Sequence, residues 1–458
     1  MQDTEKKGLS CFKAYDVRGR VPDELNEDIA FKTGQAFVTF LKARRVVVGY
    51  DIRLSSPALK TALSRGLTSC GAEVLDIGLC GTEEVYFATG ALNADGGIMV
   101  TASHNPAEYN GMKFVRSQSR PISSDTGLLE IQKMVRNNTI IKAKTAGVVR
   151  QTYIRDLYID HILSYIEPDS LKSLKAVVNA GNGCAGPVID LLEKRLPITL
   201  VKLQHEPDGK FPHGVPNPLL PENRHNTARA VIEAKADIGI AWDGDFDRCF
   251  LFDERGNFIE GYYLVGLLAG ELLRAEDATR KIIHDPRLVW NTRDIVNRKG
   301  GLPIMARTGH AFIKERMRTE DALYGGEMSG HHYFRDFNYC DSGMIPWLLV
   351  WQLMSRKNME LSKMVAERMA LYPVSGEINL KVADPDAVLA RIENYFQGAP
   401  CEKDHTDGLS ISCETFRVNV RKSNTEPVLR LNVESRGDRQ LMERKTAELL
   451  QLIKGHPL

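Results

Sequence analysis

A serine and a histidine stand side by side in the segment Thr101-Ala-Ser-His-Asn-Pro106, directly after the apolar run Gly97-Ile-Met-Val100. The run predicts a buried strand, and Pro106 prevents a helix from starting smoothly in the segment. Open α/β sheets keep their active sites just past the ends of their strands, so Ser103 lies where a reactive hydroxyl is expected. The commoner role of such a serine, a turn residue that caps the next element, is the alternative.

Three aspartates occupy alternate positions in Asp243-Gly-Asp-Phe-Asp-Arg248, which follows the apolar run of residues 236–241. In an extended segment this spacing would put all three carboxylates on one side, where their oxygens suit a hard divalent cation. Without a cation the carboxylates would repel one another, and at least one would have to stay protonated. An EF-hand loop is excluded, because its sixth position requires a glycine and this chain has Arg248 there.

Two later segments carry groups that suit sugars and phosphates. The first, Gly325-Gly-Glu-Met-Ser-Gly-His-His332, offers a carboxylate, a hydroxyl and an imidazole that can hydrogen-bond sugar hydroxyls. Neighbouring positions in a strand face opposite ways, so His331 and His332 are not expected to share one metal. The second, Arg421-Lys-Ser-Asn-Thr-Glu-Pro427, combines charge, hydroxyls, an amide and loop N–H groups, which favours a phosphate; a polar hairpin turn is the equal alternative.

A glycine-rich segment, Gly181-Asn-Gly-Cys-Ala-Gly186, matches the dinucleotide-binding pattern. It follows a predicted strand, precedes a predicted helix, and has Glu206 twenty residues further on, as that pattern requires. A nicotinamide-dependent oxidoreductase is therefore an alternative function. The simpler interpretation is a tight turn between strand and helix that needs glycines for backbone reasons.

The elements that must position these groups alternate along the chain. Apolar runs predict buried strands at residues 46–49, 74–78, 176–179, 198–203, 281–285 and 303–305, and a period near 3.6 predicts a helix over residues 57–70. Such alternation is typical of mostly parallel sheets covered by helices. The pattern changes after residue 372, because residues 416–421 and 428–433 alternate strictly between apolar and polar, as half-buried antiparallel strands do.

The bulk properties exclude several classes of protein. The chain has 458 residues, enough for three or four domains, and its formal net charge of +1 argues against a dedicated nucleic-acid-binding protein. The N-terminus lacks the apolar run of a signal peptide, and residues 345–354, the longest apolar segment, are too short to span a bilayer, so we expect a cytoplasmic protein. The eight cysteines show no CxxC pair and no zinc spacing, which predicts buried free thiols.

Taken together, the four motifs resemble those of the α-D-phosphohexomutase superfamily, and most closely those of its bacterial phosphomannomutases. The resemblance covers essentially the whole chain. It implies an α/β fold in which three similar mixed α/β domains and a smaller α+β C-terminal domain surround a central cleft. The expected domains are residues 1–149 for the phosphoserine, 150–254 for the metal, 255–371 for the sugar and 372–458 for the phosphate.

The resemblance also implies a reaction. Mannose 6-phosphate and mannose 1-phosphate would be interconverted through a phosphoserine enzyme and a hexose 1,6-bisphosphate intermediate, in a step that feeds GDP-mannose synthesis. Glucose phosphates are the alternative substrates. Because the bisphosphate must turn round between two transfers, we expect a hinge near Tyr372 and Pro373. A noncatalytic sugar-phosphate-binding protein is the remaining alternative, and the intact Ser103 and the three aspartates argue against it.

Individual residues take their expected roles from the same resemblance. Ser103 would carry the phosphoryl group and hold Mg²⁺ together with Asp243, Asp245 and Asp247. The transfer would be assisted by His104, Lys113, Arg248 and His331. Substrate would be bound by Tyr15, Arg18, Arg287, His310, Glu327, Ser329, Arg421, Ser423, Asn424 and Thr425, although some relatives have a lysine where this chain has Arg287. The expected cofactors are Mg²⁺ and hexose 1,6-bisphosphate as activator; the expected partners are small hexose phosphates, with no nucleic acid, no membrane and no obligate protein partner.

Overall fold

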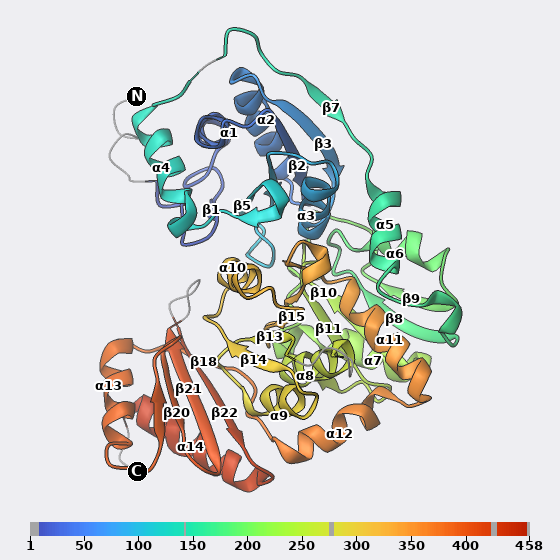
Figure 1. The fold of residues 1–458 in the computed structure, drawn as a ribbon, viewed down its shortest axis with the longest axis vertical. Coiled ribbons are helices and arrows are strands. Elements are labelled where there is room, and N and C mark those ends of the chain that lie inside the picture. Colours follow the sequence, from blue (N-terminus) through green and yellow to red (C-terminus); the bar gives the residue numbers. More distant parts are fainter. Residues whose placement is uncertain (1–8, 142, 274–278, 423–427, 456–458) are drawn as a thin grey trace. The chain divides into compact units, whose positions relative to one another are not determined.

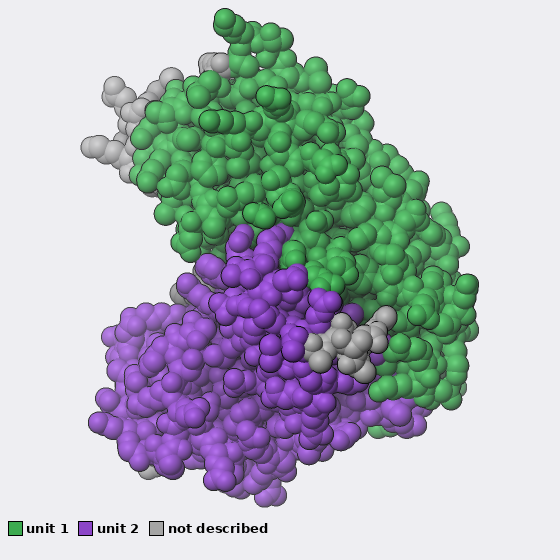
Figure 2. All heavy atoms as spheres, in the orientation of Figure 1, with its two compact units in different colours: residues 1–258, 331–358 green, residues 259–330, 359–458 purple. Residues whose placement is uncertain are grey.

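The computed structural model describes residues 9–141, 143–273, 279–422 and 428–455. The chain divides into two compact units, coloured separately in Figure 2. Unit 1 comprises Met1–Phe258 and His331–Asn358, and unit 2 comprises Ile259–Gly330 and Met359–Leu458. Both units combine helices with strands (Figure 1). The expected hinge at Tyr372 and Pro373 falls inside unit 2 and stays a prediction.

The first sheet of unit 1 has the strand order β1-β5-β4-β2-β3-β7, with β6 paired to β5. Its strands are β1 (Val17–Arg20), β2 (Arg45–Tyr50), β3 (Glu73–Leu79), β4 (Gly96–Val100), β5 (Tyr109–Arg116), β6 (Arg120–Pro121) and β7 (Val149–Gln151). The accompanying helices are α1 (Glu27–Leu41), α2 (Ser56–Ser69), α3 (Thr82–Ala91) and α4 (Leu128–Asn137). Strand β2 is parallel to β4, with Tyr50 opposite Val100, so the loops that follow these two strands emerge at the same edge of the sheet.

The second sheet of unit 1 contains the run β11-β10-β8-β9. Its elements are α5 (Arg155–Leu163), β8 (Leu174–Asn179), α6 (Gly186–Glu193), β9 (Ile198–Leu203), α7 (His225–Ala234), β10 (Ile238–Trp242) and β11 (Cys249–Phe252); β12 (Phe258–Ile259) follows along the chain. Strand β10 is parallel to β8 and antiparallel to β11. The segment Asp243–Arg248 therefore connects two adjacent strands and lies at the carboxyl end of β10.

The glycine-rich segment after β8 is a structural turn. A Cβ on Gly183 would lie 2.6 Å from the carbonyl oxygen of Gly244, and Cβ atoms on Gly181 and Gly186 would collide with Pro216 and with the backbone of His205. The backbone N–H of Cys184 donates to the same Gly244 oxygen at 3.0 Å. The glycines are needed because the chain's own backbone packs against them, which favours the tight-turn interpretation over a dinucleotide site.

The segment of residues 331–358 completes unit 1. It contains β16 (His332–Phe334), the antiparallel β17 (Cys340–Asp341) and the helix α11 (Ile345–Lys357). The buried Glu83 carboxylate, at the start of α3, accepts hydrogen bonds from the Tyr158 and Ser342 hydroxyls and from the Gly343 N–H. Burial raises the pKa of Glu83 well above its usual range. This one side chain connects three segments that lie far apart in the sequence.

Unit 2 begins with a parallel arrangement in which β13 (Lys281–His284) pairs with both β14 (Leu302–Met305) and β15 (Tyr324–Gly326). Its helices are α8 (Gly261–Leu272), α9 (Trp290–Arg298), α10 (His310–Glu320) and α12 (Leu361–Leu371). The strands predicted across both units, and the helix predicted at residues 57–70, are confirmed apart from small shifts at their ends. Within the described residues, no helix is both long and apolar enough to cross a membrane.

The C-terminal part of unit 2 is an antiparallel sheet in the order β18-β22-β21-β20-β19, with α13 (Pro385–Tyr395) and α14 (Arg439–Lys454). Its strands are β18 (Ile378–Leu380), β19 (Glu402–Asp404), β20 (Leu409–Ser412), β21 (Phe416–Lys422) and β22 (Leu429–Ser435). The prediction that β21 is half-buried was wrong, because its polar residues Arg417, Asn419 and Arg421 are buried as well. Arg417 donates to the backbone carbonyls of Pro286 and Arg287, so the loop after β13 covers this face.

The prediction that all cysteines are free thiols was also wrong. Cys401 and Cys413 form a disulfide, with their Cα atoms 4.2 Å apart. Strands β19 and β20 pair with Glu402 opposite Ser412, so the next residues outward, Cys401 and Cys413, face each other across the hairpin. Their spacing in the sequence matches no motif, because strand register brings them together. The other six cysteines form no disulfide in the part of the chain that the structure describes, and five of them are buried.

Candidate active site

Ser103 lies in the loop after β4 and is 4% exposed. Its φ of 49° is in the left-handed region, which is uncommon for a residue with a side chain, so the loop must be held in place. The Ser103 N–H donates to the Thr101 hydroxyl at 2.9 Å. Gly244 approaches from the other side, where a Cβ would lie 2.7 Å from the Ser103 carbonyl oxygen. The serine loop and the aspartate loop are therefore in direct contact.

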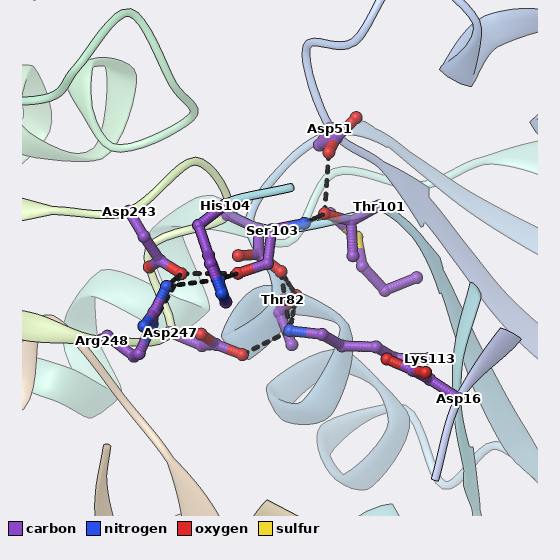
Figure 3. A network of polar contacts seen from close by, with 12 residues as sticks. Asp16, Asp51, Thr82, Thr101, Ser103, His104, Lys113, Asp243, Asp247 and Arg248 are labelled. Carbon is purple, nitrogen blue, oxygen red and sulfur yellow. Dashed lines mark hydrogen bonds and ion pairs between the residues drawn. The ribbon is translucent and has the colours of Figure 1, made fainter. Parts of the chain in front are cut away.

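The Ser103 hydroxyl lies between an aspartate and a histidine (Figure 3). Its Oγ donates to Asp243 Oδ2 at 2.7 Å and lies 3.0 Å from His104 Nδ1. Arg248 Nη2 lies 2.6 Å from the same His104 nitrogen, and Arg248 Nε donates to Asp243 Oδ2 at 2.9 Å. Burial and the Arg248 charge hold the pKa of His104 well below its usual range, so the ring is neutral and its Nδ1 accepts a hydrogen bond from Arg248. In this arrangement His104 orients the arginine, while Asp243 accepts a hydrogen bond from the serine hydroxyl.

The three aspartates converge through a turn. Residues 243–248 are not extended as predicted: the Phe246 N–H donates to the Asp243 carbonyl at 3.1 Å, and Phe246 has a φ of 43°. All three carboxylates are completely buried, and each contributes an oxygen to a group whose members lie within 4.8 Å of one another. The predicted convergence is observed, and the turn rather than the period of a strand produces it.

This carboxylate group has the features of a cation site. Within the described residues, Oδ1 of Asp243, Asp245 and Asp247 is buried and has no hydrogen-bond partner. Burial and the neighbouring charge of Asp245 raise the pKa of Asp247 to about 7. Buried carboxylate oxygens without donors fit a hard divalent cation, which would supply the missing positive charge. The three carboxylates therefore fit the Mg²⁺ ion that is expected from the sequence.

Lys113, on β5, is buried beside the aspartates. Its Nζ donates to Asp245 Oδ2 at 2.8 Å and to Asp247 Oδ2 at 2.6 Å. Burial alone would lower the pKa of Lys113, but the two carboxylates outweigh it and hold the pKa above its ordinary value. Lys113 is therefore not a solvated surface charge.

Thr82, which the sequence did not single out, supports the same carboxylate. Its hydroxyl donates to Asp245 Oδ2 at 2.5 Å, and its N–H donates to the Asp245 carbonyl at 3.0 Å. The two residues are 163 positions apart, and Thr82 begins α3 in a segment with no recognisable motif. No pattern in the sequence could have indicated this contact.

His331 lies near Asp247. Its Nδ1 is 2.8 Å from Asp341 Oδ2 and 3.9 Å from Asp247 Oδ1. Asp341, on β17, is a second residue that sequence reasoning missed. Unit 1 therefore brings together the predicted residues Ser103, His104, Lys113, Asp243, Asp245, Asp247, Arg248 and His331.

Arg18, on β1, reaches the serine loop as well. It donates to Asn105 Oδ1 and to Asp16 Oδ2, both at 2.6 Å. Tyr15 is half-buried in the turn that precedes β1. Arg18 therefore lies in the same neighbourhood as Ser103, and Tyr15 is adjacent in sequence to its partner Asp16.

A second cluster of predicted residues lies in unit 2. Arg287 Nη2 donates to Asp285 Oδ2 at 2.7 Å and to the Ser329 hydroxyl at 3.2 Å, and it lies 3.7 Å from Glu327 Oε1. The Gly309 N–H donates to the same Glu327 oxygen at 3.0 Å, which places the neighbouring His310 at this cluster. Burial raises the pKa of Asp285, but Arg287 outweighs it and holds the pKa below its usual range.

Arg421 joins this cluster through Glu377, which sequence reasoning did not identify. Glu377 Oε2 is 3.2 Å from Arg287 Nη1 and 3.7 Å from Arg421 Nη2, and its Oε1 is 3.1 Å from Arg430 Nη1. Arg421 and Arg430 are cross-strand neighbours on β21 and β22. The predicted phosphate ligands Ser423, Asn424 and Thr425 lie outside the described residues.

Comparisons with known proteins cover nearly the whole chain. Four family models match in order: phosphoglucomutase/phosphomannomutase α/β/α domain I at residues 10–141, domain II at residues 156–256, domain III at residues 260–372, and the C-terminal domain at residues 377–451. The fold is therefore three α/β/α domains followed by a C-terminal domain.

Curated relatives and a solved structure agree with these models. A phosphomannomutase of Salmonella montevideo is 59% identical over 452 residues, which span 97% of this chain and 99% of the relative. Proteins of Xanthomonas campestris pv. campestris named phosphohexose mutases are 57% identical over 447 residues, spanning 98% of this chain and all of the relative. A phosphoglucomutase/phosphomannomutase family protein of Burkholderia thailandensis superposes with a TM-score of 0.87 at 32% identity, covering 97% of this chain and 98% of its own. This chain belongs to the phosphoglucomutase/phosphomannomutase family, whose members are intramolecular phosphotransferases.

Proposed function

We propose that this chain is a phosphomannomutase, which interconverts mannose 6-phosphate and mannose 1-phosphate through a phosphoserine at Ser103. The observation that carries the proposal is the Ser103 hydroxyl, 2.7 Å from Asp243 at the edge of three buried carboxylates that each retain an oxygen without a donor. The relatives that are 55–59% identical over nearly their whole length support the mannose preference, because most of them are named phosphomannomutases.

The side chains around Ser103 suit phosphoryl transfer. A hydroxyl of the hexose monophosphate would attack the phosphorus of the phosphoserine, the bond from phosphorus to Ser103 Oγ would break, and the proton of the attacking hydroxyl would end on Ser103 Oγ. Asp243, Asp245 and Asp247 would hold Mg²⁺, which neutralises charge on the transferring phosphoryl group when it is bound. Arg248 and Lys113 would add positive potential from groups already fixed by hydrogen bonds. The second transfer, from the other end of the bisphosphate, restores the phosphoserine.

Unit 2 would recognise the substrate. Glu327 and Ser329 offer a carboxylate and a hydroxyl for sugar hydroxyls, and Arg287 and Arg421 offer guanidinium groups for the phosphate that is not transferred. The expected ligands Ser423, Asn424 and Thr425 would complete that phosphate site. A fungal relative of the same fold, N-acetylphosphoglucosamine mutase of Aspergillus fumigatus, was solved with GlcNAc-6P and magnesium, at a TM-score of 0.61 and 14% identity. The product, mannose 1-phosphate, would feed GDP-mannose synthesis.

The test is turnover of pure protein with mannose 1-phosphate, Mg²⁺ and a trace of hexose 1,6-bisphosphate. We expect mannose 6-phosphate to form, and we expect EDTA and the Ser103→Ala change each to abolish its formation. A protein that shows no hexose phosphate interconversion under these conditions would refute the proposal.

Phosphoglucomutase activity is the second candidate, and one observation favours it. The Xanthomonas campestris relatives are named phosphohexose mutases, without restriction to mannose. The two epimers differ only in the position of O2. Both can therefore reach a carboxylate and a hydroxyl such as those of Glu327 and Ser329. Comparing kcat/KM for mannose 1-phosphate and glucose 1-phosphate decides between the candidates: a higher value for the glucose ester would replace the first candidate by the second.

A further inference from the structure

A buried arginine, Arg53, donates hydrogen bonds to the backbone of the loop that carries Ser103. Arg53 lies in the loop after β2, next to the loop after β4 that carries Ser103, because β2 and β4 are parallel neighbours. Its guanidinium donates to four backbone carbonyls of that second loop: Nη1 to Pro106 at 2.7 Å and Tyr109 at 2.9 Å, and Nη2 to Ser103 at 2.9 Å and Asn105 at 2.6 Å. One side chain therefore holds the loop at four points.

The guanidinium is itself fixed in place. Arg53 is 1% exposed, its Nε lies 3.3 Å from Asp51 Oδ2, and the ring of Phe211 lies 5.5 Å from its central carbon. The same Asp51 oxygen accepts from the Thr101 hydroxyl at 2.7 Å, and that hydroxyl accepts from the Ser103 N–H at 2.9 Å (Figure 3). The backbone of Ser103 is thus held at its N–H through Asp51 and Thr101, and at its carbonyl through Arg53.

These hydrogen bonds stabilise the unusual backbone conformation of Ser103. A left-handed φ is unfavourable for serine and persists only where surrounding contacts impose it. Arginine presents five N–H donors in a rigid plane, whereas a lysine ammonium is a single point of charge with three donors. Only a guanidinium at this position can bind all four carbonyls at once. Among the described residues, none of the hydrogen bonds that the Arg53 side chain donates goes to the Ser103 hydroxyl, to Asp243, Asp245 or Asp247, or to the clusters of unit 2.

We propose that Arg53 is a positioning residue for phosphoryl transfer: it fixes the Ser103 hydroxyl against Asp243 without touching the substrate. This inference rests on the proposed function of Ser103 as phosphoryl carrier. Displacement of a reacting group by about 1 Å can cost on the order of 10² in rate. Loss of the Arg53 contacts should therefore lower kcat and leave substrate binding intact.

The test is the Arg53→Ala variant, assayed with and without guanidinium chloride at concentrations well below those that unfold the protein. We expect kcat to fall by on the order of 10²-fold, KM to stay close to the wild-type value, and added guanidinium to restore part of the lost kcat, because it can occupy the space of the deleted group. Arg53→Lys should show an intermediate kcat. The matched control is Arg65→Ala, an exposed arginine on α2, in which neither kcat nor the response to guanidinium should change.

Two results would overturn the inference: wild-type kcat in Arg53→Ala, or a loss that appears mainly in KM and is not relieved by guanidinium. If Arg53→Ala does not fold, Thr101→Val and Thr101→Ser decide the question. The valine variant, which cannot bind Asp51 or the Ser103 N–H, should lose about tenfold in kcat, as expected for a missing hydrogen bond, while the serine variant retains activity. Equal kcat in both would contradict the inference. The wild type is assayed first, so absent turnover would refute the proposed function separately.

Discussion

The two charged clusters of this protein differ in which kind of polar atom is left without a partner. At the three aspartates of unit 1, the buried side-chain atoms without hydrogen bonds among the described residues are acceptors, the Oδ1 atoms of Asp243, Asp245 and Asp247. Nε of Arg18 and Nε of Arg53, at the nearby serine loop, are donors that also lack a hydrogen bond to any described residue. In the arginine cluster of unit 2, the donors Nε of Arg287 and Nε of Arg421 have no hydrogen-bond partner among the described residues, and neither has the acceptor Asp407 Oδ2. Glu377 lies 3.7 Å from Arg421 Nη2, and Asp407 lies 3.8 Å from Arg421 Nε. Buried acceptors without donors attract a cation, and buried donors without close acceptors attract an anion.

The difference assigns complementary tasks to the two units. Unit 1 would hold a divalent cation next to the serine, and unit 2 would hold the phosphate of a sugar. Burial lowers the pKa of Arg421, which is the direction expected for a guanidinium whose carboxylate partners are distant. The same comparison predicts that removing a negative charge has opposite consequences in the two units.

The largest effect should follow loss of an acceptor in unit 1. Asp245→Ala removes a proposed cation ligand and a partner of Lys113, so kcat should fall by at least about 10²–10³-fold. Binding of Mn²⁺, measured by electron paramagnetic resonance as a substitute for Mg²⁺, should weaken as well. Asp28→Ala, which removes a highly exposed aspartate on α1, is the control and should retain both properties. Unchanged Mn²⁺ binding in Asp245→Ala would show that the carboxylates do not form the cation site.

A smaller effect should follow loss of a donor in unit 2. Arg421→Ala should raise KM for mannose 1-phosphate by about 10- to 100-fold, the range expected for a hydrogen bond to a charged group. It should also make turnover depend on added hexose 1,6-bisphosphate, because the intermediate escapes, while Ser103 can still be phosphorylated. Lys422→Ala is the matched control, since Lys422 is the next residue on β21 and pairs with the exposed Asp386. Normal KM and normal retention of the intermediate in Arg421→Ala would argue against the phosphate site.

Glu377→Gln is the sharpest test of the comparison, because it deletes a negative charge from the cluster of arginines. The carboxylate of Glu377 pairs with Arg287, Arg421 and Arg430 and would compete with phosphate for them. The Glu377→Gln variant should therefore bind inorganic phosphate several-fold more tightly. Titration calorimetry with inorganic phosphate measures the change. Weaker binding in the variant would mean that Glu377 serves to orient the arginines and does not oppose the anion.

The smallest effect concerns pH. Burial raises the pKa of Glu377, but Arg287, Arg430 and Arg421 outweigh it, so the pKa lies below that of an unfolded glutamate. The stabilisation from this carboxylate is therefore complete above the unfolded pKa, near 4.3, and is lost as the pH falls through and below that value. Thermal unfolding between about pH 5 and pH 3 should show a falling midpoint, with a shallower slope in Glu377→Gln. Identical slopes would exclude Glu377 as a contributor.

Much of the fold and of the cluster in unit 1 could be predicted, because the information is local. Apolar runs identified the strands that end at the site, and short motifs identified Ser103 and the aspartates. Even there the backbone geometry differs from an extended strand, because a turn with a left-handed Phe246 brings the three carboxylates together. The role of Lys113 depended on resemblance, because a single lysine carries no pattern.

The parts that escaped prediction depend on contacts between distant segments. Thr82 and Asp341 meet the aspartates and His331 only after the chain has folded, and each is an ordinary polar residue in its own segment. The disulfide between Cys401 and Cys413 follows from strand register. The alternation of residues in β21 indicates which side chains are polar, and it therefore predicted an exposed polar face. That face is buried, because Arg417 donates to backbone carbonyls more than a hundred residues away.

The central claim is that Ser103 carries the phosphoryl group, and the most direct measurement is the site of phosphate in the active enzyme. After incubation with hexose 1,6-bisphosphate, intact-mass analysis and peptide mapping should find one phosphate, on Ser103, and removal of excess bisphosphate followed by hexose monophosphate should discharge it. Ser103→Ala should take up no phosphate and should lose turnover. Full turnover in that variant, or an active wild type whose phosphate lies on another residue, would contradict the account.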